Sequence, residues 1–306
     1  MLGMRVVHLA SLLSIWGVFA CSADQPPGSE TNGVGTGAGS RPGTGSNNGG
    51  GPSIIITDPN SNPGTGAVTG DGDCSSILDV LYRDFSESHP DFEMPFMGDV
   101  VRRGLVETTL GADQKPVFKD RVGYAALPGS PTAFKTDWRP DTPVVASAES
   151  FSQWYTTTTN VNLPFPKKLP LTEVQPGIFG FDSAAFFPLA PTEGFGITPK
   201  AGNHQGNNFL FTTEVHVLFN YTGGQKFTFR GDDDLWIFVN RKLALDLGSM
   251  HNAEEGTIDF DAQAAELGIA VGGNYEMDIF HAERHTSASN FKITTNIACF
   301  TPTVIK

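Results

Sequence analysis

Alternation of apolar and polar residues in the last third of the chain is the feature that most constrains its fold. In the segment TEVHVLFNY, the side chains of Val215, Val217 and Phe219 fall on one face, because residues two apart share a face in a β-strand. QKFTFR and KLALDL alternate in the same way, whereas LWIFVN is apolar on both faces. A run that is apolar on both faces predicts a strand inside a two-layer sandwich.

Further segments extend this pattern to a whole β domain. YEMDIF and NFKITTNIACF supply two more strands, and turns are expected at Gly223-Gly224 and Asn240-Arg241. SSILDVLYRDF fits either a first strand or a short helix, while ESFSQWYTTT and DAQAAELGI predict short helices. About ten antiparallel strands with one or two short helices predict an all-β sandwich or barrel.

The N-terminal residues carry export signals instead of a domain pattern. Residues 1–20 have a basic start and an apolar run too short to predict a spanning helix, which is typical of a secretory signal peptide. The run ends in VFAC, which resembles a bacterial lipobox and predicts acylation of Cys21. Ser22 after this cysteine favours the outer membrane, by resemblance to lipoproteins of Gram-negative bacteria. The alternative is cleavage after Ala20 that leaves Cys21 as a free thiol.

Composition then divides the rest of the chain in two. Residues 21–73 are rich in Gly, Ser, Thr and Pro, and they have too few apolar side chains to form a core, which predicts a flexible tether. Residues 74–306 form the expected β domain. Cys74 and Cys299 bracket this domain, and an even pair of cysteines in an exported chain suggests a disulfide, with two free thiols as the alternative.

The charge of the chain limits its partners. The formal net charge is −13, and no basic stripe is present to replace the counterions of phosphate groups. Nucleic acid is therefore not an expected partner. Gly-x-Ser-x-Gly is absent from the predicted domain, and no cysteine remains as a nucleophile, so we do not expect an enzyme.

Three consecutive aspartates, Asp232, Asp233 and Asp234, precede the apolar strand LWIFVN. Like charges repel, and an unpaired carboxylate is costly to bury, so we expect these residues in the turn that leads into the strand. Adjacent carboxylates supply the oxygen ligands and the charge that hard cations prefer. The alternative is that these side chains cap the turn through bonds to the main chain and remain solvated.

Three longer segments resemble a known family when they are taken together and in order. YRDFSESHPDFE, GDDDLWIFVNRKLALDLGSMH and DIFHAERHTSASNFKI look like parts of the fibro-slime domain, which is related to the domain first described in anthrax protective antigen. The resemblance covers about residues 80–300. It implies a β-barrel or sandwich of the kind found in toxins, glycosidases and flocculin adhesins, where it binds sugars through calcium.

The resemblance also implies a set of site residues. In the sugar-binding relatives, two consecutive aspartates joined by a cis peptide bind calcium, and these positions match Asp232 and Asp233. A later loop supplies the remaining protein ligands, and Glu283 and Asn290 are the candidates in ERHTSASN.

Three further residues are candidate ligand contacts, namely Asp234, Arg241 and His285. Arg241 stands where the family's turn usually has glycine, so either the turn differs or Arg241 is kept there for contact with a ligand or partner. A third reading is that the strain is tolerated without any function.

Two alternatives stay open for these segments. In HAERH the side chains of His281, Glu283 and His285 would share one face of a strand, and two imidazoles with a carboxylate are also zinc ligands. The other reading is a hydrogen-bonded network in which Arg284 pairs with an acid. Trp138, Trp154 and Tyr155 are aromatics that either stack on sugar rings or pack in the core.

Together these features predict an exported module that is lipid-anchored at the outer membrane or cell surface of a Gram-negative bacterium. The expected partner is polysaccharide or extracellular matrix, which the module binds in adhesion with calcium as the cofactor. A structural or protein-interaction module with no sugar or metal site is the alternative.

Overall fold

The computed structural model describes five stretches of the chain, which are residues 74–95, 100–126, 141–198, 206–286 and 288–303. The predicted signal peptide, acylated Cys21 and tether therefore lie outside the described residues, as does Trp138. Within the described stretches, no helix is both long enough and apolar enough to cross a membrane.

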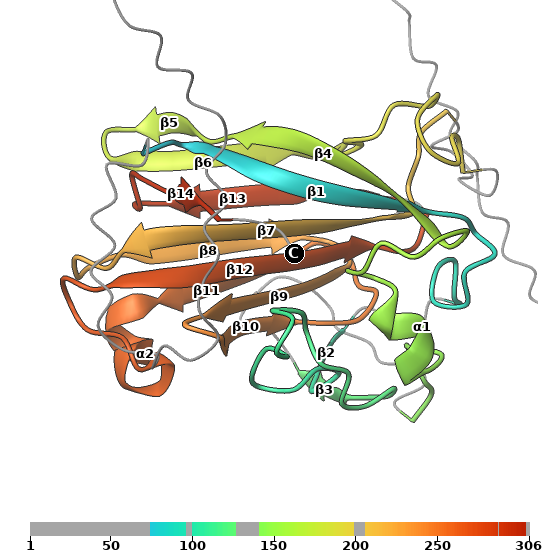
Figure 1. Cartoon of the computed structure of the whole chain (residues 1–306), viewed down its shortest axis with the longest axis horizontal. Helices are drawn as coiled ribbons and strands as arrows, with labels where there is room; N and C mark the ends of the chain where they lie inside the picture. Colours follow the sequence, from blue (N-terminus) through green and yellow to red (C-terminus); the bar gives the residue numbers. More distant parts are fainter. Residues whose placement is uncertain (1–73, 96–99, 127–140, 199–205, 287, 304–306) are drawn as a thin grey trace, which may run out of the picture. The chain divides into compact units, whose positions relative to one another are not determined.

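Seven strands form the larger of the two main sheets, which is the front layer in Figure 1. Its order is β10 (Lys242–Leu247), β9 (Asp234–Val239), β12 (Asn274–Glu283), β7 (Phe211–Asn220), β1 (Ile77–Phe85) and β4 (Asn162–Pro170), with β14 (Thr301–Pro302) paired to β7. Every pairing is antiparallel. SSILDVLYRDF, which fits a strand or a helix by sequence, is therefore strand β1.

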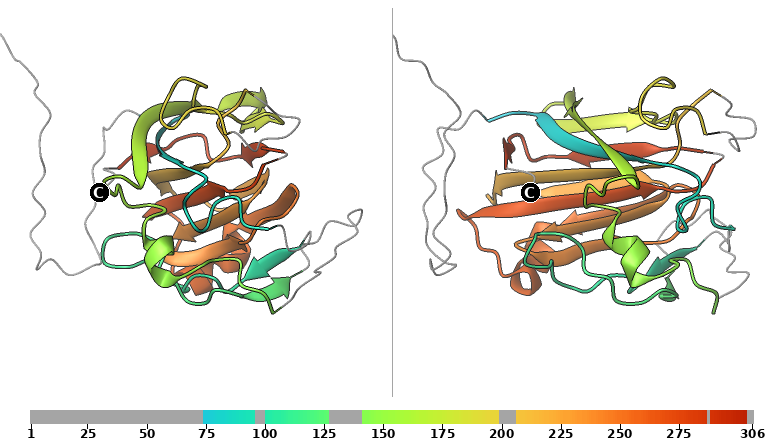
Figure 2. Two further views of the ribbon diagram at one scale, coloured as in Figure 1. Left: turned by 90° about the vertical axis from the view of Figure 1, so that its right-hand side faces the viewer. Right: turned by 45° about the vertical axis from the view of Figure 1, so that its right-hand side comes forward.

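Five strands form the second sheet, which lies behind the first (Figure 2). Its order is β11 (Glu254–Asp259), β8 (Lys226–Gly231), β13 (Phe291–Thr295), β6 (Ile178–Ser183) and β5 (Thr172–Gln175). A short hairpin of β2 (Val101–Arg103) and β3 (Tyr124–Ala126) stands apart. The all-β sandwich is confirmed, and the described residues hold fourteen strands because several of them have only two to four residues.

Strand β9 is buried along its whole length, for a reason that differs from the prediction. Leu235, Ile237 and Val239 point into the core between the two sheets. Trp236 and Phe238 point the other way, into a second apolar cluster on the outer face of the larger sheet. Loops and a short helix between the first strands cover this outer face, so the strand has a third layer above it.

The two predicted helices are present and short. Helix α1 (Ala148–Ser152) begins after Ser147, whose side chain caps the first turn and exchanges hydrogen bonds with Ser150. Helix α2 (Phe260–Leu267) begins after Asp259, which accepts a hydrogen bond from the N–H of Ala262. It ends at Gly268 in the left-handed conformation (φ 71°), which glycine adopts without a steric cost.

The ends of the described domain are joined. Cys74 and Cys299 form a disulfide with a Cα–Cα distance of 5.2 Å, so the expected pairing is confirmed. The neighbouring residues Ser75 and Phe300 exchange main-chain hydrogen bonds of 3.1 and 3.0 Å. Both ends therefore meet at one end of the larger sheet, where β1 starts and β12 starts.

The opposite end of that sheet collects the predicted site. Strand β9 starts at Asp234, and Asp234 pairs with Ala282 near the end of β12. Glu283 in turn pairs with Phe211 at the start of β7. Three aspartates and the ERHTSASN segment therefore meet because antiparallel strands bring the start of one strand to the end of the next.

Candidate functional site

Asp232 and Asp233 lie in the loop between β8 and β9, and a cis peptide bond joins them, as the family resemblance implies. Asp232 is 3% exposed, and its carboxylate accepts hydrogen bonds from the main-chain N–H of Asn290 and from Asn290 Nδ2 at 2.8 Å. The structure thus brings together two residues that are distant in sequence and that were predicted to share a site. Burial raises the pKa of Asp232, while the bonds from Asn290 lower it.

Asp233 is held from both sides of the loop. Its Oδ1 accepts a hydrogen bond from the N–H of His251 at 3.2 Å, and its Oδ2 accepts from the N–H groups of Arg284 and His285 at 3.1 and 3.0 Å. Burial and the neighbouring Asp232 nevertheless raise the pKa of this carboxyl well above its usual range. The Asp233 carboxylate is therefore both fixed in place and short of positive charge.

Glu283, the last residue of β12, has no exposed surface. Its carboxylate oxygens make no hydrogen bond of normal geometry among the described residues, although the Ser289 side chain and the N–H of His285 lie close enough to lower its pKa. Burial raises its pKa well above the usual range, and the charges of Asp233 and Asp232 raise it further. A buried carboxylate without a hydrogen bond of normal geometry is costly, so its persistence calls for an explanation.

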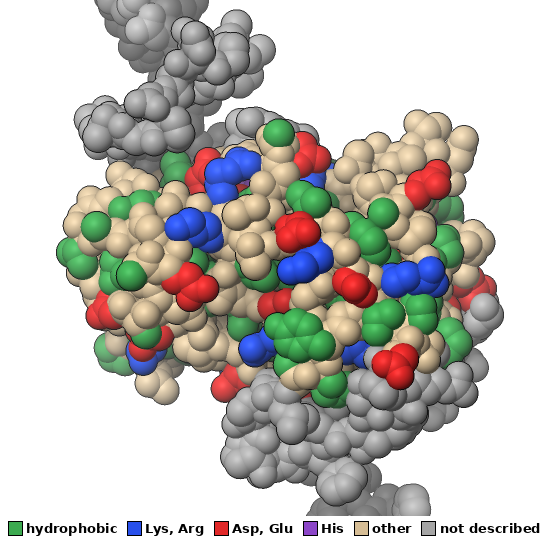
Figure 3. All heavy atoms as spheres, turned by 90° about the horizontal axis from the view of Figure 1, so that it is seen from below, with side chains coloured by type: hydrophobic (Ala, Val, Ile, Leu, Met, Phe, Trp, Pro, Cys, Tyr) green, Lys and Arg blue, Asp and Glu red, His purple; other side chains and the backbone are tan. Residues whose placement is uncertain are grey.

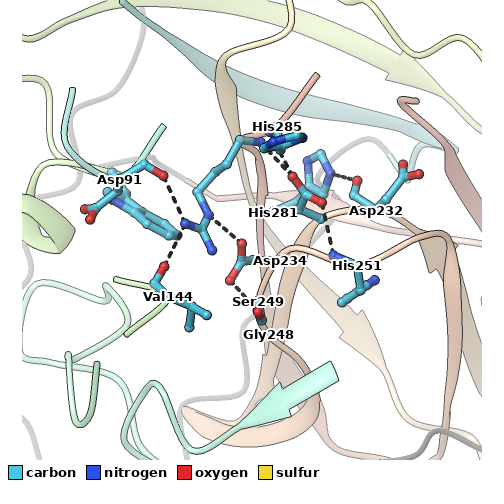
Figure 4. Close-up of polar contacts among 12 residues, drawn as sticks. Asp91, Val144, Asp232, Asp234, Gly248, Ser249, His251, His281 and His285 are labelled. Atoms are coloured by element: carbon cyan, nitrogen blue, oxygen red, sulfur yellow. Dashed lines mark hydrogen bonds and ion pairs between the residues drawn. The ribbon is translucent and has the colours of Figure 1, made fainter. Parts of the chain in front are cut away.

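Asp234 plays a different part from the two aspartates before it. It is the first residue of β9, it has no exposed surface, and its Oδ2 accepts a hydrogen bond from Arg284 Nε at 2.7 Å. Its Oδ1 accepts from the N–H of Ser249 at 2.6 Å. The network in which Arg284 pairs with an acid is therefore confirmed, and Figure 4 marks the contacts of Asp234 with dashed lines.

Arg284 also reaches residues that the sequence did not mark as functional. Its Nη1 donates to the main-chain carbonyls of Asp91 and Val144 at 3.0 and 2.9 Å, and its guanidinium lies 4.6 Å from the centre of the Trp154 ring. Asp91 accepts a hydrogen bond from Trp154 Nε1 at 2.9 Å. Asp91 lies in YRDFSESHPDFE, one of the segments that carry the family resemblance. The local sequence around Asp91 does not indicate that it contacts Arg284 or Trp154.

The histidines of HAERH do not form a zinc site. The ring nitrogens of His281 lie 3.1 Å from Thr213 Oγ1 and 2.9 Å from the main-chain carbonyl oxygen of Asp232. Burial lowers the pKa of His281 to about 4, so the ring is neutral at physiological pH and braces the aspartate loop. His285 is only partly buried, and its Nδ1 lies 2.9 Å from the carbonyl oxygen of Thr286.

Arg241 lies at the far end of β9, away from the aspartates. Its φ angle is 64° and that of Asn240 is 50°, so both residues of the turn are left-handed although neither is a glycine. The guanidinium donates to the carbonyl oxygens of Gly111 and Leu110, and the Arg241 carbonyl accepts from the N–H of Leu110. These contacts hold the side chain in place and give it a structural role at this turn.

The aromatic candidates are core residues where they are described. Trp154 has no exposed surface and Tyr155 is 2% exposed, and both belong to the cluster on the outer face of the larger sheet. Neither ring is available to stack on a ligand. Core packing, one of the two readings of the sequence, is the correct one for this pair.

The donor set of Asp232, Asp233, Glu283 and Asn290 suits a hard cation, because all four supply oxygen ligands. The two oxygens of Glu283, which make no hydrogen bond of normal geometry, are the observation that favours a cation here. Within the part of the chain that the structure describes, three or more acidic, histidine or cysteine side chains do not converge in a metal-binding arrangement. A cation would therefore have to draw Glu283 toward the aspartates.

Comparisons with known proteins place the chain beside a group of large proteins. No family model matches the chain. It is 34% identical over 226 residues to Protein psiD of Dictyostelium discoideum, which covers 73% of this chain and 42% of psiD. It is 31% identical over 227 residues to Protein psiC of the same organism, which covers 72% of this chain and 41% of psiC. The chain spans less than half the length of these curated relatives.

Two solved structures show a weaker likeness. A PA14 sugar-binding domain from an RTX adhesin has 15% identity and a TM-score of 0.21, with 29% of this chain and 48% of that chain covered. A PA14 domain of the antifreeze protein MpAFP has 8% identity and a TM-score of 0.26, with 75% and 85% covered. These TM-scores are low, and the fold described above rests on the chain's own strands.

Proposed function

We propose that this chain is an exported, surface-anchored module that binds carbohydrate in adhesion, and that calcium in the aspartate loop takes part. The observation that supports this is the buried carboxylate of Glu283, which has no hydrogen bond of normal geometry and whose pKa is raised by burial and by the charges of Asp233 and Asp232. A divalent cation would offset two of these three charges and reduce the cost of burying them.

Asp232, Asp233, Glu283 and Asn290 would hold the cation. When it is bound, calcium supplies coordination positions that sugar hydroxyl oxygens can complete. The chain's own contribution is to fix the loop: His251, Arg284 and His285 orient Asp233 through their N–H groups. The acidic chain would bind neutral sugars in preference to anionic ones, because its net charge is −13.

Acylation of Cys21 at an outer membrane, followed by the Gly-rich tether, is part of the same proposal. It rests on the lipobox-like sequence VFAC and on the composition of residues 21–73. Radioactive palmitate should label the full chain in a Gram-negative host, and Cys21→Ser should not be labelled. An unlabelled wild-type chain would contradict the anchor and leave the carbohydrate proposal standing.

Calorimetric titration of the full chain with calcium tests the site. At free calcium about 100 times the dissociation constant, the free energy of unfolding should rise by about 2.7 kcal/mol. Glu283→Gln removes one buried charge without changing the size of the side chain. It should melt higher than the wild type in chelator and should show no calcium-induced shift.

Glu107→Gln is the matched control, because Glu107 is a half-exposed glutamate outside the aspartate loop, with Lys119 Nζ 3.9 Å from its Oε2. It should respond to calcium as the wild type does. A glycan array then tests the ligand, and binding should disappear with chelator. The absence of both calcium heat and array binding would favour a structural or protein-interaction module, a role that the saturated hydrogen bonds of Asp233 and Asp234 also fit.

A further inference from the structure

A cleft lies along β10, and its lining residues do not include the aspartates of the loop. Strand β10 is an edge strand of the larger sheet and β11 is an edge strand of the smaller one. The two strands are not hydrogen-bonded to each other, and Leu245 of β10 packs against Gly256 of β11. The hairpin of β2 and β3 stands on the other side of β10, and Gly104 just after β2 donates to Asp246 of β10 at 2.9 Å. The cleft has a volume of about 530 Å³. Figure 3 views the molecule from this side.

The wall of the cleft carries polar groups that the fold does not use. Glu255 and Glu266 are exposed, Gln263 is half-buried, and all three line the cleft. Among the described residues, none of their side chains has a hydrogen bond or an ion pair. Two carboxylates and an amide therefore offer free acceptors, and the amide also offers donors.

A second cavity in the domain has polar side chains that are already hydrogen-bonded. The amide side chains of Asn220, Gln225 and Asn296 line a cavity of about 380 Å³ near the disulfide. Each of them is engaged by main-chain groups, with contacts such as Asn220 Nδ2 to the Gly273 carbonyl at 3.3 Å and Asn296 Nδ2 to the Gly224 carbonyl at 3.0 Å. Those amides hold loops together, whereas the side chains of the β10 cleft remain free for a ligand.

Tyr124 stands at the rim of the cleft with 63% of its surface exposed. Its ring lies against Gly104, where a Cβ would come within 3.0 Å of Cε1, so the missing side chain gives the ring its place. The aromatic face is thus supported from one side and open to solvent on the other. An exposed, supported ring is suited to stacking against the apolar face of a ligand.

The floor of the cleft combines apolar surface with a half-buried arginine. Leu243, Ala244 and Leu245 supply the apolar part. Arg103 also lines the cleft, and its Nε is buried without a hydrogen-bond partner. Asp246 accepts hydrogen bonds from the N–H groups of Gly104 and Gly248 and from Trp236 Nε1. Burial raises the pKa of Asp246, and the positive charge of Arg103 lowers it.

We propose that this cleft is a second carbohydrate site that works without calcium. A neutral oligosaccharide presents an apolar C–H face to Tyr124 and hydroxyl groups to Glu255, Glu266 and Gln263. The volume is within the range of small-molecule sites, which is about 300 to 1,000 Å³. Acidic sugars are disfavoured, because both free carboxylates line the same wall. The cleft site shares only its ligand class, carbohydrate, with the proposed function.

The proposed cleft site is tested by calorimetric titration of the full chain. The probes are maltotetraose, cellotetraose and mannotetraose, each titrated with EDTA in excess. Binding should be present for at least one probe and should weaken roughly ten-fold or more in Tyr124→Ala, through loss of the stacking face. Glu266→Gln keeps the shape of the side chain and should weaken binding by a smaller factor. Thermal melting of each variant checks that the fold is retained.

Phe195→Ala is the matched control, because Phe195 is an aromatic residue that is 46% exposed and does not line this cleft. It should bind as the wild type does. Glycan binding that occurs only with calcium contradicts the proposed cleft site, and so does binding that Tyr124→Ala leaves unchanged. Binding of an extended peptide, with no binding of the three oligosaccharides, also contradicts it. Binding in EDTA together with no calcium response would remove the aspartate-loop site and leave the cleft in place.

Discussion

Arg284 has no exposed surface, yet its guanidinium connects three separate parts of the chain. It pairs with Asp234 and donates to the carbonyls of Asp91 and Val144. Arg284→Met should cost about 3–5 kcal/mol of the free energy of unfolding, because the carboxylate of Asp234 stays buried with only the N–H of Ser249 to compensate it. Urea unfolding measures this loss.

The double variant with Asp234→Asn distinguishes the ion pair from simple packing. When both charges are removed, no unpaired charge remains in the core, so the double variant should lose less than the sum of the two single changes. Strict additivity would show that the two side chains act independently.

His216 is a buried histidine whose charge depends on two acidic partners. Its Nδ1 lies 2.6 Å from Asp278 Oδ1 and its Nε2 lies 2.8 Å from Glu214 Oε1. Burial alone lowers the pKa of His216, but these two acids raise it to about 9. Arg83 and Lys115 also pair with Glu214 in the same buried cluster.

This raised pKa predicts a loss of stability in alkali. The charged ring stabilises the fold fully below the unfolded value of about 6.5, and this contribution is lost as the pH rises through about 9. Between about pH 6.5 and 9, the melting temperature of His216→Gln should therefore change less with pH than that of the wild type. His285→Gln, outside the cluster, should keep the wild-type slope, and identical slopes in all three proteins would refute the assignment.

At the scale of elements, the turn between β9 and β10 shows how the chain replaces a glycine. Arg241 has a positive φ, which costs a residue with a Cβ about 1 kcal/mol, and its guanidinium compensates by binding the carbonyls of Gly111 and Leu110. Arg241→Ala loses the guanidinium hydrogen bonds but keeps the energetic cost of the positive φ. Arg241→Gly loses the same hydrogen bonds and also removes that cost. The glycine variant should thus be about 1 kcal/mol more stable than the alanine variant, as measured by chemical denaturation. Equal stabilities would mean that the turn relaxes.

Alternation predicted the strands of the last third because their side chains report directly on which face is buried. Leu235 to Val239 was recognised as a strand apolar on both faces, but the layer that covers its outer face comes from residues far away in sequence. Short strands such as β2 and β3 have only three residues each and leave no periodic signal. Tertiary contacts, rather than local pattern, decide such segments.

The site shows the same division between local and distant information. The three aspartates were visible as a run, and the family resemblance placed Asn290 beside Asp232, where the hydrogen bonds now join them. The pairing of Arg284 with Asp234 in particular, and the burial of Glu283 without a hydrogen bond of normal geometry, could not be derived from sequence. Both depend on which strand ends meet, which only the register of β9 and β12 determines.

For the molecule as a whole, the disulfide is the main covalent constraint. It joins residues separated by 225 positions, and closing a loop of that length in the unfolded chain is worth about 5 kcal/mol in the entropic model. The double variant Cys74→Ser with Cys299→Ser should unfold at lower urea concentration. A reducing agent should lower the midpoint of the wild type to the same extent and leave the variant unchanged.

A wild-type midpoint that does not respond to reduction would show that the bridge contributes little. The hydrogen bonds between Ser75 and Phe300 would then be sufficient to keep the two ends together.

The joined ends also decide how the domain carries mechanical load. If the chain is pulled on both sides of the domain, the tension passes from Cys74 to Cys299 through a covalent bond and bypasses the hydrogen bonds between the strands. The ten residues of β12 separate this junction from the aspartate loop by about 30 Å. A ligand held at that far end would pull against the sheet, whereas a chain pulled through its two ends would leave the sheet intact.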